Sequence, residues 1–240
     1  MPDSPGNEKD GLFDRALLVS LQDVPGGKAG TFNFVLNFTG PRQPQSASDS
    51  HTFADTGITV TGDFWTAWQG GRSFEESVYI NGLPITPERD ETSPTDGKVY
   101  RTQWFERTRF EYHPENAPPN NVLLGLLGTA AARARQAEAP FVRIDNPGGE
   151  LPYFSQTGHT LGDGSEGGRA IAALWDRLGG LAQFGYPISQ PFNETNKSDG
   201  KQYLVQYFER QRFEYHPENR GTAFEVLLGR LGAEQVGGGD

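Results

Sequence analysis

The chain has 240 residues, carries a formal net charge of −10 and contains no cysteine. The acidic balance argues against nucleic acid as a partner, because phosphate binding needs clustered Lys and Arg. The lack of cysteine excludes disulfides and thiolate metal sites. No run of about 18 apolar residues is present, so we expect no membrane span. The abundance of glycine (31) and proline (17) favours short elements joined by turns.

The first 50 residues read as an N-terminal extension and linker. Within them Phe32, Phe34, Leu36 and Phe38 alternate with Asn33, Val35 and Asn37. A period of two is typical of a strand with one buried face. We therefore expect this extension to contain β structure.

The rest of the chain is organised around a stretch that occurs twice. Gln103–Asn116 and Gln206–Asn219 differ at only two positions, one of which exchanges Trp104 for Tyr207. Such a match within one chain indicates an internal duplication. The flanking similarities place repeat unit 1 at residues 51–128 and repeat unit 2 at residues 151–234. A helical and Gly-Pro-containing linker occupies residues 129–150.

Each unit shows the same succession of local patterns. In the second unit Ile171, Leu174, Trp175 and Leu178 form one apolar helical stripe that Gly179 ends. A Gly-X-Pro turn and a polar loop follow, over residues 87–96 and 190–199. Alternation from Tyr203, a reversal at residues 209–211 and a return strand at residues 212–216 then predict a β-hairpin. The expected fold is α+β, with two tandem helix-plus-β-hairpin repeat units related by approximate two-fold symmetry.

The segments Gly179–Gly180, Phe184–Pro187, Gln206–Phe208 and Val226–Gly229 together resemble the LGFP repeat. The repeated hairpin sequence is also similar to secreted repeat modules of Chloroflexi-type bacteria. The resemblance implies an extracellular repeat of the cell envelope, as found in actinobacteria and related phyla and often joined to wall hydrolases. It implies no specific ligand. The sequence itself shows no signal peptide, so the expected extracellular or envelope location depends on this resemblance.

Aromatic and basic side chains of the two hairpins are the candidate ligand-binding residues. Alternate strand residues point to opposite faces, so one aromatic set builds the core. The other set is either exposed to a ligand or covered by a second unit or a partner chain. Exposed Tyr and Trp beside Arg make stacking and hydrogen-bonding platforms for sugars or peptides. The candidates are Trp104, Tyr112, Tyr207, Tyr215, Arg109 and Arg212.

A metal site is a weaker hypothesis for the same hairpin. Glu214, His216 and Glu218 have the i, i+2, i+4 spacing that shares one face of a strand. Pro217 bends that strand, however, and no second His follows nearby. The favoured alternative is that these groups bind one another, Arg212 or a turn backbone. No cofactor is expected.

Catalysis is the least favoured alternative, because the sequence lacks a G-x-S-x-G elbow, an H-E-x-x-H helix and a Walker-type loop. A hydrolase would have to use Glu111 and Glu214 with the neighbouring His. We expect instead a non-catalytic envelope module that binds wall polysaccharide or peptidoglycan, or another envelope protein, through two hairpin surfaces. The structural alternative is a surface protein that forms homo-oligomers. The insertion Arg72–Asn81 and the exchange of Ile58 for His159 predict that the two halves differ in function.

Overall fold

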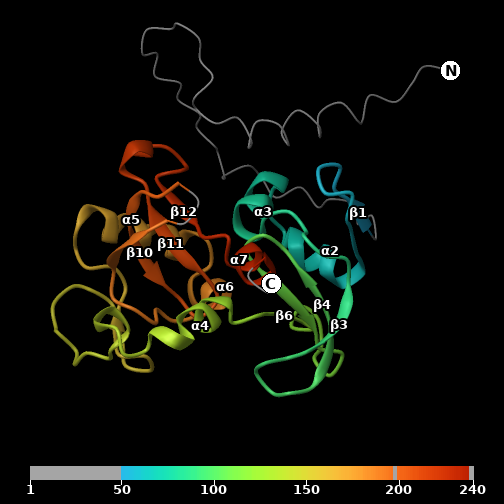
Figure 1. Ribbon diagram of the computed structural model, residues 1–240, viewed down its shortest axis with the longest axis horizontal. Helices are drawn as coiled ribbons and strands as arrows, with labels where there is room; N and C mark the ends of the chain where they lie inside the picture. Colours follow the sequence, from blue (N-terminus) through green and yellow to red (C-terminus); the bar gives the residue numbers. More distant parts are fainter. Residues whose placement is uncertain (1–49, 197–198, 238–240) are drawn as a thin grey trace, which may run out of the picture. The chain divides into compact units, whose positions relative to one another are not determined.

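The computed structural model describes residues 50–196 and 199–237. The strand predicted for Phe32–Phe38 lies outside the described residues. Short helices and small antiparallel sheets alternate along the described part, which confirms the predicted α+β class (Figure 1). None of the described helices is long and apolar enough to cross a membrane.

The first repeat consists of a two-stranded hairpin, two helices and a four-stranded antiparallel sheet with strand order β3-β4-β5-β6. Its elements are β1 (Ser50–Thr52), β2 (Thr59–Thr61), α2 (Gly62–Gln69), α3 (Phe74–Asn81), β3 (Arg89–Thr92), β4 (Val99–Trp104), β5 (Arg109–Tyr112) and β6 (Val122–Leu124). The linker then forms α4 (Leu127–Ala132), η1 (Arg133–Arg135) and η2 (Ala139–Phe141).

The second repeat has the matching strand order, β9-β10-β11-β12 read in chain order. Its elements are β7 (Tyr153–Phe154), β8 (His159–Thr160), α5 (Glu166–Arg177), α6 (Gly180–Phe184), β9 (Phe192–Thr195), β10 (Gln202–Tyr207), β11 (Arg212–Tyr215), η3 (Pro217–Asn219), β12 (Val226–Leu228) and α7 (Leu231–Gly237). The central strands pair in the same register in both sheets, since Gln103 faces Phe110 and Gln206 faces Phe213.

The polar segments predicted as loops contain β3 and β9, so each predicted hairpin is the centre of a four-stranded sheet. β9 is the short sequence Phe192-Asn-Glu-Thr195, which has no run of alternating apolar residues. Among the described strands it lies at the edge of the sheet and pairs with β10. Polar residues are common on edge strands, where one side of the strand meets solvent, and such strands carry little hydrophobic pattern.

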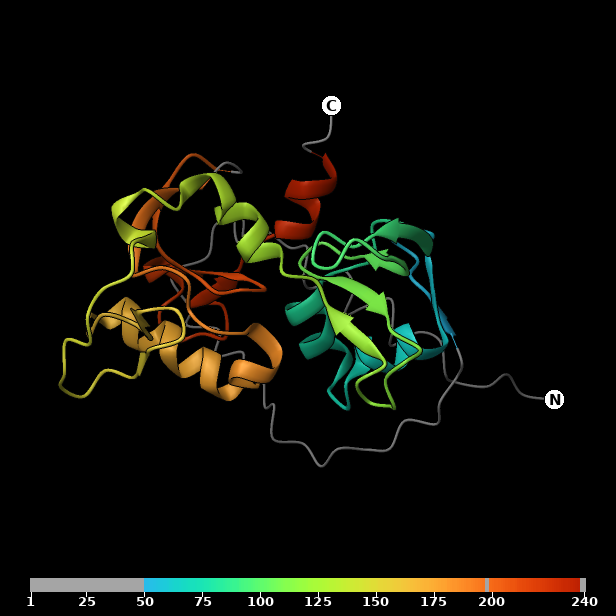
Figure 2. The same ribbon diagram turned by 90° about the horizontal axis from the view of Figure 1, so that it is seen from below.

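The two faces of β10 belong to different cores, as the alternation predicts. Leu204 and Phe208 pack with α5 in the inner core, which includes Trp175. Val205 and Tyr207, with Tyr203, pack in a second cluster against Ala132 and Phe141 of the linker. The linker therefore covers the outer face of the second sheet, and Figure 2 shows α4 in lime beside the orange strands.

The helices that follow the two sheets dock on the opposite repeats. α4 follows the first sheet, and the Thr129 N–H donates to the carbonyl oxygen of Glu209 at 3.0 Å. α7 follows the second sheet, and the Ala233 N–H donates to the carbonyl oxygen of Glu106 at 3.0 Å. Both acceptors lie in hairpin turns, and α4 and α7 also contact each other. The exchange is reciprocal, so each repeat is completed by a helix from the other.

Two glycines make this exchange feasible. A Cβ at Gly128 would overlap the carbonyl oxygen of Phe208, and a Cβ at Gly232 would overlap the carbonyl oxygen of Phe105. Only a residue without a side chain allows the helix backbone so close to the turn. The repeated Leu-Gly ending of the units is therefore explained by close backbone approach.

Side chains from the insertion and the turns also join the repeats. Tyr79 on α3, within the inserted segment, donates its hydroxyl to the carbonyl oxygen of Val226. Arg107 Nε donates to the Leu228 carbonyl at 3.1 Å, and Gln211 Nε2 donates to the Arg107 carbonyl at 3.1 Å. The insertion thus contributes to the contact between the repeats.

A buried glutamine joins the separate elements of each repeat. Gln206 is fully buried, and its amide donates to the carbonyl oxygens of Thr160 (2.7 Å) and Ser189 (3.0 Å). Its Oε1 accepts the Gly162 N–H at 3.0 Å. Gln103 makes the corresponding amide contacts in the first repeat.

We expect Gln206→Leu to lower the free energy of unfolding by at least about 2 kcal/mol, because each buried backbone group left without a hydrogen bond costs about 1–3 kcal/mol. Urea denaturation followed by tryptophan fluorescence measures this loss. An unchanged midpoint would show that water replaces the lost contacts.

Candidate functional site

A cavity of about 420 Å³ lies on the outer face of the second sheet, between its strands and the two exchanged helices. Its volume falls within the range of small-ligand pockets. The sheet side contributes Glu194, Thr195, Asn196, Val205, Tyr207, Arg212 and Glu214. The linker and α7 contribute Ala131, Arg135, Leu231, Glu234 and Gln235. The cavity therefore depends on segments from three parts of the chain.

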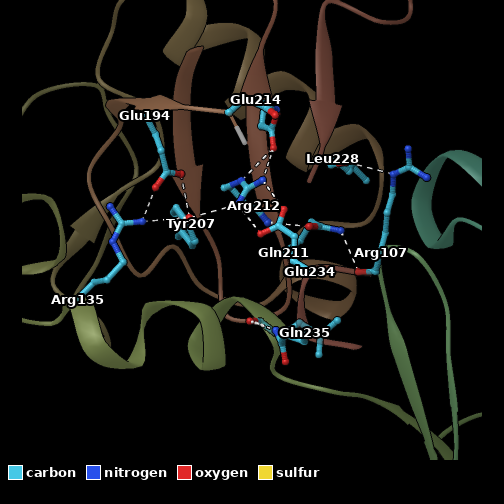
Figure 3. A network of polar contacts seen from close by, with 12 residues as sticks. Arg107, Arg135, Glu194, Tyr207, Gln211, Arg212, Glu214, Leu228, Glu234 and Gln235 are labelled. Carbon is cyan, nitrogen blue, oxygen red and sulfur yellow. Dashed lines mark hydrogen bonds and ion pairs between the residues drawn. The ribbon is translucent and has the colours of Figure 1, made fainter. Parts of the chain in front are cut away.

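Tyr207 and Glu194 form one polar side of the cavity, together with Arg135 (Figure 3). The Tyr207 hydroxyl donates to Glu194 Oε2 at 2.9 Å, and Arg135 Nη1 forms an ion pair with the same carboxylate. The Arg135 guanidinium lies 5.5 Å from the centre of the Tyr207 ring, within cation–π distance. Burial raises the pKa of Tyr207 to about 12, so its hydroxyl keeps its proton at neutral pH.

Arg212 forms the other polar side of the cavity, between two carboxylates. Its Nη2 lies 2.7 Å from Glu214 Oε1 and 2.8 Å from Glu234 Oε1. Burial alone raises the pKa of Glu214, but His216, Arg212 and Asn196 outweigh it and hold that pKa below its usual range. Glu214 is therefore ionised at neutral pH.

The first repeat carries a related cluster, which lacks counterparts of the charged side chains of Arg135 and Glu234 among the described residues. Trp104 Nε1 donates to Glu91 Oε2 at 2.9 Å, and Arg109 Nε donates to the same oxygen at 3.1 Å. Arg109 also forms an ion pair with Glu111, and its guanidinium lies 5.3 Å from the Trp104 ring. Arg135 and Glu234, by contrast, lie in the second-repeat cluster. The two halves thus present different chemistry on corresponding faces.

The structure separates the predicted ligand-binding residues into two groups. Tyr207 and Arg212 line the cavity, and Trp104 and Arg109 belong to the related cluster of the first repeat. The remaining tyrosines lie on the inner faces, since Tyr215 is buried in the core of the second repeat and Tyr112 packs against that of the first.

The aromatic stacking surface predicted from the sequence is not formed by the tyrosines of the second repeat. Tyr207 is 2 % exposed and Tyr215 is 9 % exposed. Covering elements leave no ring face for an incoming sugar. Tyr207 lines the cavity, and its hydroxyl group is hydrogen-bonded to Glu194.

The candidate metal ligands contact one another and their neighbours. His216 Nδ1 lies 3.1 Å from Glu218 Oε1, and its Nε2 lies 3.8 Å from Glu214 Oε2. Burial lowers the pKa of His216, but the two carboxylates reverse this and the net pKa is raised. In residues 50–196 and 199–237 no three His, Asp or Glu side chains gather as a metal site would require. The geometry is that of an ion-paired hairpin end.

The carboxylates of the two hairpin turns accept hydrogen bonds from the backbone. Glu209 Oε2 accepts the Tyr186 N–H at 3.0 Å, and Glu106 Oε2 accepts the Leu83 N–H at 3.2 Å. Each carboxylate thus links a hairpin turn to the Gly-X-Pro turn of its own repeat by a hydrogen bond.

His159 makes stability depend on pH. It is 2 % exposed, and burial followed by the nearby charge of Arg143 lowers its pKa to about 4. The folded protein resists protonation while the unfolded chain accepts a proton near pH 6.5. The free energy of unfolding should therefore fall between pH 6.5 and 4, by up to about 1.4 kcal/mol per pH unit.

We expect His159→Ile, which installs the residue type of the first repeat (Ile58), to remove this part of the acid dependence. Urea denaturation at a series of pH values compares the two slopes. Identical slopes below pH 6.5 would show that His159 does not cause the acid sensitivity.

Sequence reasoning missed Arg135, Glu194 and Glu234. Glu194 could have been found, since Glu91 occupies the corresponding position of the first repeat. Arg135 lies in the linker, and Glu234 corresponds to Ala130 in the first closing segment, so the duplication marks neither of them. Their placement depends on the exchange of helices.

Comparison with protein-family models, with curated proteins and with solved structures gives no match for this chain. The resemblance to the LGFP repeat therefore stays a prediction. The geometry shows a cavity on the outer face of a sheet, lined by charged, polar and apolar side chains.

Proposed function

We propose that the chain is a non-catalytic binding module of the cell envelope that recognises a wall polysaccharide or peptidoglycan through the second-repeat cavity. The observation that carries this proposal is the cavity itself, which combines about 420 Å³ of space with carboxylate, guanidinium, amide and phenol groups. Such a lining suits a ligand rich in hydroxyl groups, because each hydroxyl group can both donate and accept hydrogen bonds.

The proposal differs from the sequence-based one in its geometry. The cavity of the second repeat replaces two shallow aromatic surfaces, since Tyr207 and Tyr215 are buried. An extracellular location and kinship with LGFP repeats belong to the same proposal and depend on the resemblance of the repeated segments.

Retention of the purified chain on insoluble peptidoglycan and on insoluble polysaccharides tests the proposal, with light scattering on the same sample. Ala131→Phe should fill the cavity from α4 and abolish retention. Ala130→Phe is the matched control, because Ala130 is exposed on the same helix and lies outside the cavity. It should be retained like the original chain.

Equal retention of Ala131→Phe would contradict the site. No retention of the original chain, together with dimers or larger species in solution, would instead favour the self-associating surface protein.

A further inference from the structure

The hydrogen-bond donors of the two cavity arginines are already used within the protein. All three nitrogens of Arg212 donate, to Glu214, Glu234 and the Tyr207 hydroxyl oxygen. Arg135 donates through Nε and Nη2 to Glu138, which lies outside the cavity lining, and through Nη1 to Glu194 and Tyr207. The guanidinium groups therefore have little left to offer an acidic ligand.

The carboxylates, in contrast, retain acceptor capacity. An ionised carboxylate has about four lone-pair positions. Glu194 accepts from Arg135 and from the Tyr207 hydroxyl, and Glu234 accepts from the Nη1 and Nη2 groups of Arg212. Both side chains are partly exposed, at 21 % and 35 %. Among the charged groups of the lining, the carboxylates thus have acceptor capacity left, whereas the guanidinium groups have few donors left.

The charge of the lining points the same way. Three carboxylates (Glu194, Glu214 and Glu234) face two guanidinium groups (Arg135 and Arg212), which leaves one negative charge in excess. A negative ligand would add an acceptor and a like charge. A positively charged donor would complete both the hydrogen bonding and the charge balance.

We propose that the cavity selects a primary ammonium group carried by a small polar ligand and rejects carboxylates and phosphates. This inference rests on the proposed glycan-binding function and narrows it to an unacetylated amino sugar. The shared chemistry, an ammonium beside hydroxyl groups or a short chain, also occurs in diamino side chains of wall peptides.

Titration calorimetry with glucosamine, glucose and glucuronate at pH 6 tests the selection, since the three sugars share size but carry positive, zero and negative charge. Glucosamine should bind at least about tenfold more tightly than glucuronate, with glucose between them. 1,5-Diaminopentane separates the two sources of the ammonium group. If 1,5-diaminopentane binds and glucosamine does not, the ligand is a diamine. If glucosamine binds and 1,5-diaminopentane does not, the ligand is an amino sugar.

Variants then place the selection in the cavity. Glu234→Gln removes one acceptor charge from a partly exposed position and should reduce the preference for glucosamine over glucuronate at least about fivefold. Glu91→Gln is the matched control, because Glu91 occupies the position of Glu194 in the first repeat and does not line the cavity. It should leave the preference unchanged.

Glucuronate binding as tightly as glucosamine would overturn the inference, as would no binding of any amine. Retention on an acidic wall polymer with that reversed preference would leave the proposed glycan binding intact. Amine binding by a chain that no wall material retains would support the ammonium selection and contradict the proposed glycan binding.

Discussion

Gly232→Ala should lower the free energy of unfolding by about 3 kcal/mol, because overpacking a close contact typically costs 1–3 kcal/mol and here the obstacle is backbone. The added Cβ would overlap the Phe105 carbonyl oxygen. α7 would have to move off the first-repeat turn and lose the hydrogen bond from the Ala233 N–H to Glu106. Urea denaturation followed by circular dichroism measures the change.

The same helix provides the control for this substitution. A Cβ at Gly237 meets no atom within 4 Å. Gly237→Ala should therefore be neutral or slightly stabilising, as alanine favours helix over glycine. Gly128→Ala should match Gly232→Ala in cost, since its Cβ would overlap the Phe208 carbonyl oxygen. Equal stability of all three variants would show that the exchanged helices do not hold the repeats together.

Arg212→Met should cost about 3–5 kcal/mol, the range expected when one partner of a buried ion pair is removed. Glu214 is 4 % exposed, so its carboxylate would stay buried without its guanidinium partner. Glu234 would lose both of its Arg212 contacts at the same time. Methionine keeps most of the side-chain volume, so the loss of unfolding free energy measures the lost charge and hydrogen bonds.

The cost of Arg212→Met should also shrink as the pH falls toward 4. Glu214 has a lowered pKa in the folded protein, so its contribution to stability is present above about pH 4.5 and is lost at lower pH. Without Arg212 that carboxyl would protonate more readily and relieve the buried charge. Urea denaturation at pH 4 and pH 7 measures both values.

Arg220→Met is the matched control for the arginine substitution. Arg220 pairs with Glu166 at 2.6 Å, but the two side chains are 68 % and 45 % exposed. Such surface pairs contribute at most about 1 kcal/mol. A loss from Arg212→Met no larger than that of Arg220→Met would contradict the role assigned to the buried pair.

The local structure followed from the sequence where local patterns were strong. The stripe from Ile171 to Leu178 predicted α5, and the alternation from Tyr203 predicted β10 with its two faces. The edge strands β3 and β9 were missed because their short polar sequences carry no alternation. Edge strands are specified by pairing with a neighbour, which local periodicity does not report.

The site was less predictable because it depends on contacts distant in sequence. The duplication marked Tyr207 and Arg212, yet it did not show that the linker would cover Tyr207 and exclude stacking. Nor could it place Arg135 and Glu234 beside them, since the helices carrying those residues dock across the repeats. The closing glycines were visible as a repeated motif, but their reason lies in backbone approach to the opposite turn.

Hydrogen exchange with and without a soluble wall glycan fragment tests whether the second repeat holds the ligand site, because the two sheets serve as internal references for each other. Binding in the cavity should slow exchange in β10, β11 and α7, at residues 202–207, 212–215 and 231–237. The corresponding strands of the first repeat, at residues 99–104 and 109–112, should remain unchanged. Equal protection of both sheets, or protection confined to the first, would contradict a ligand site in the second repeat.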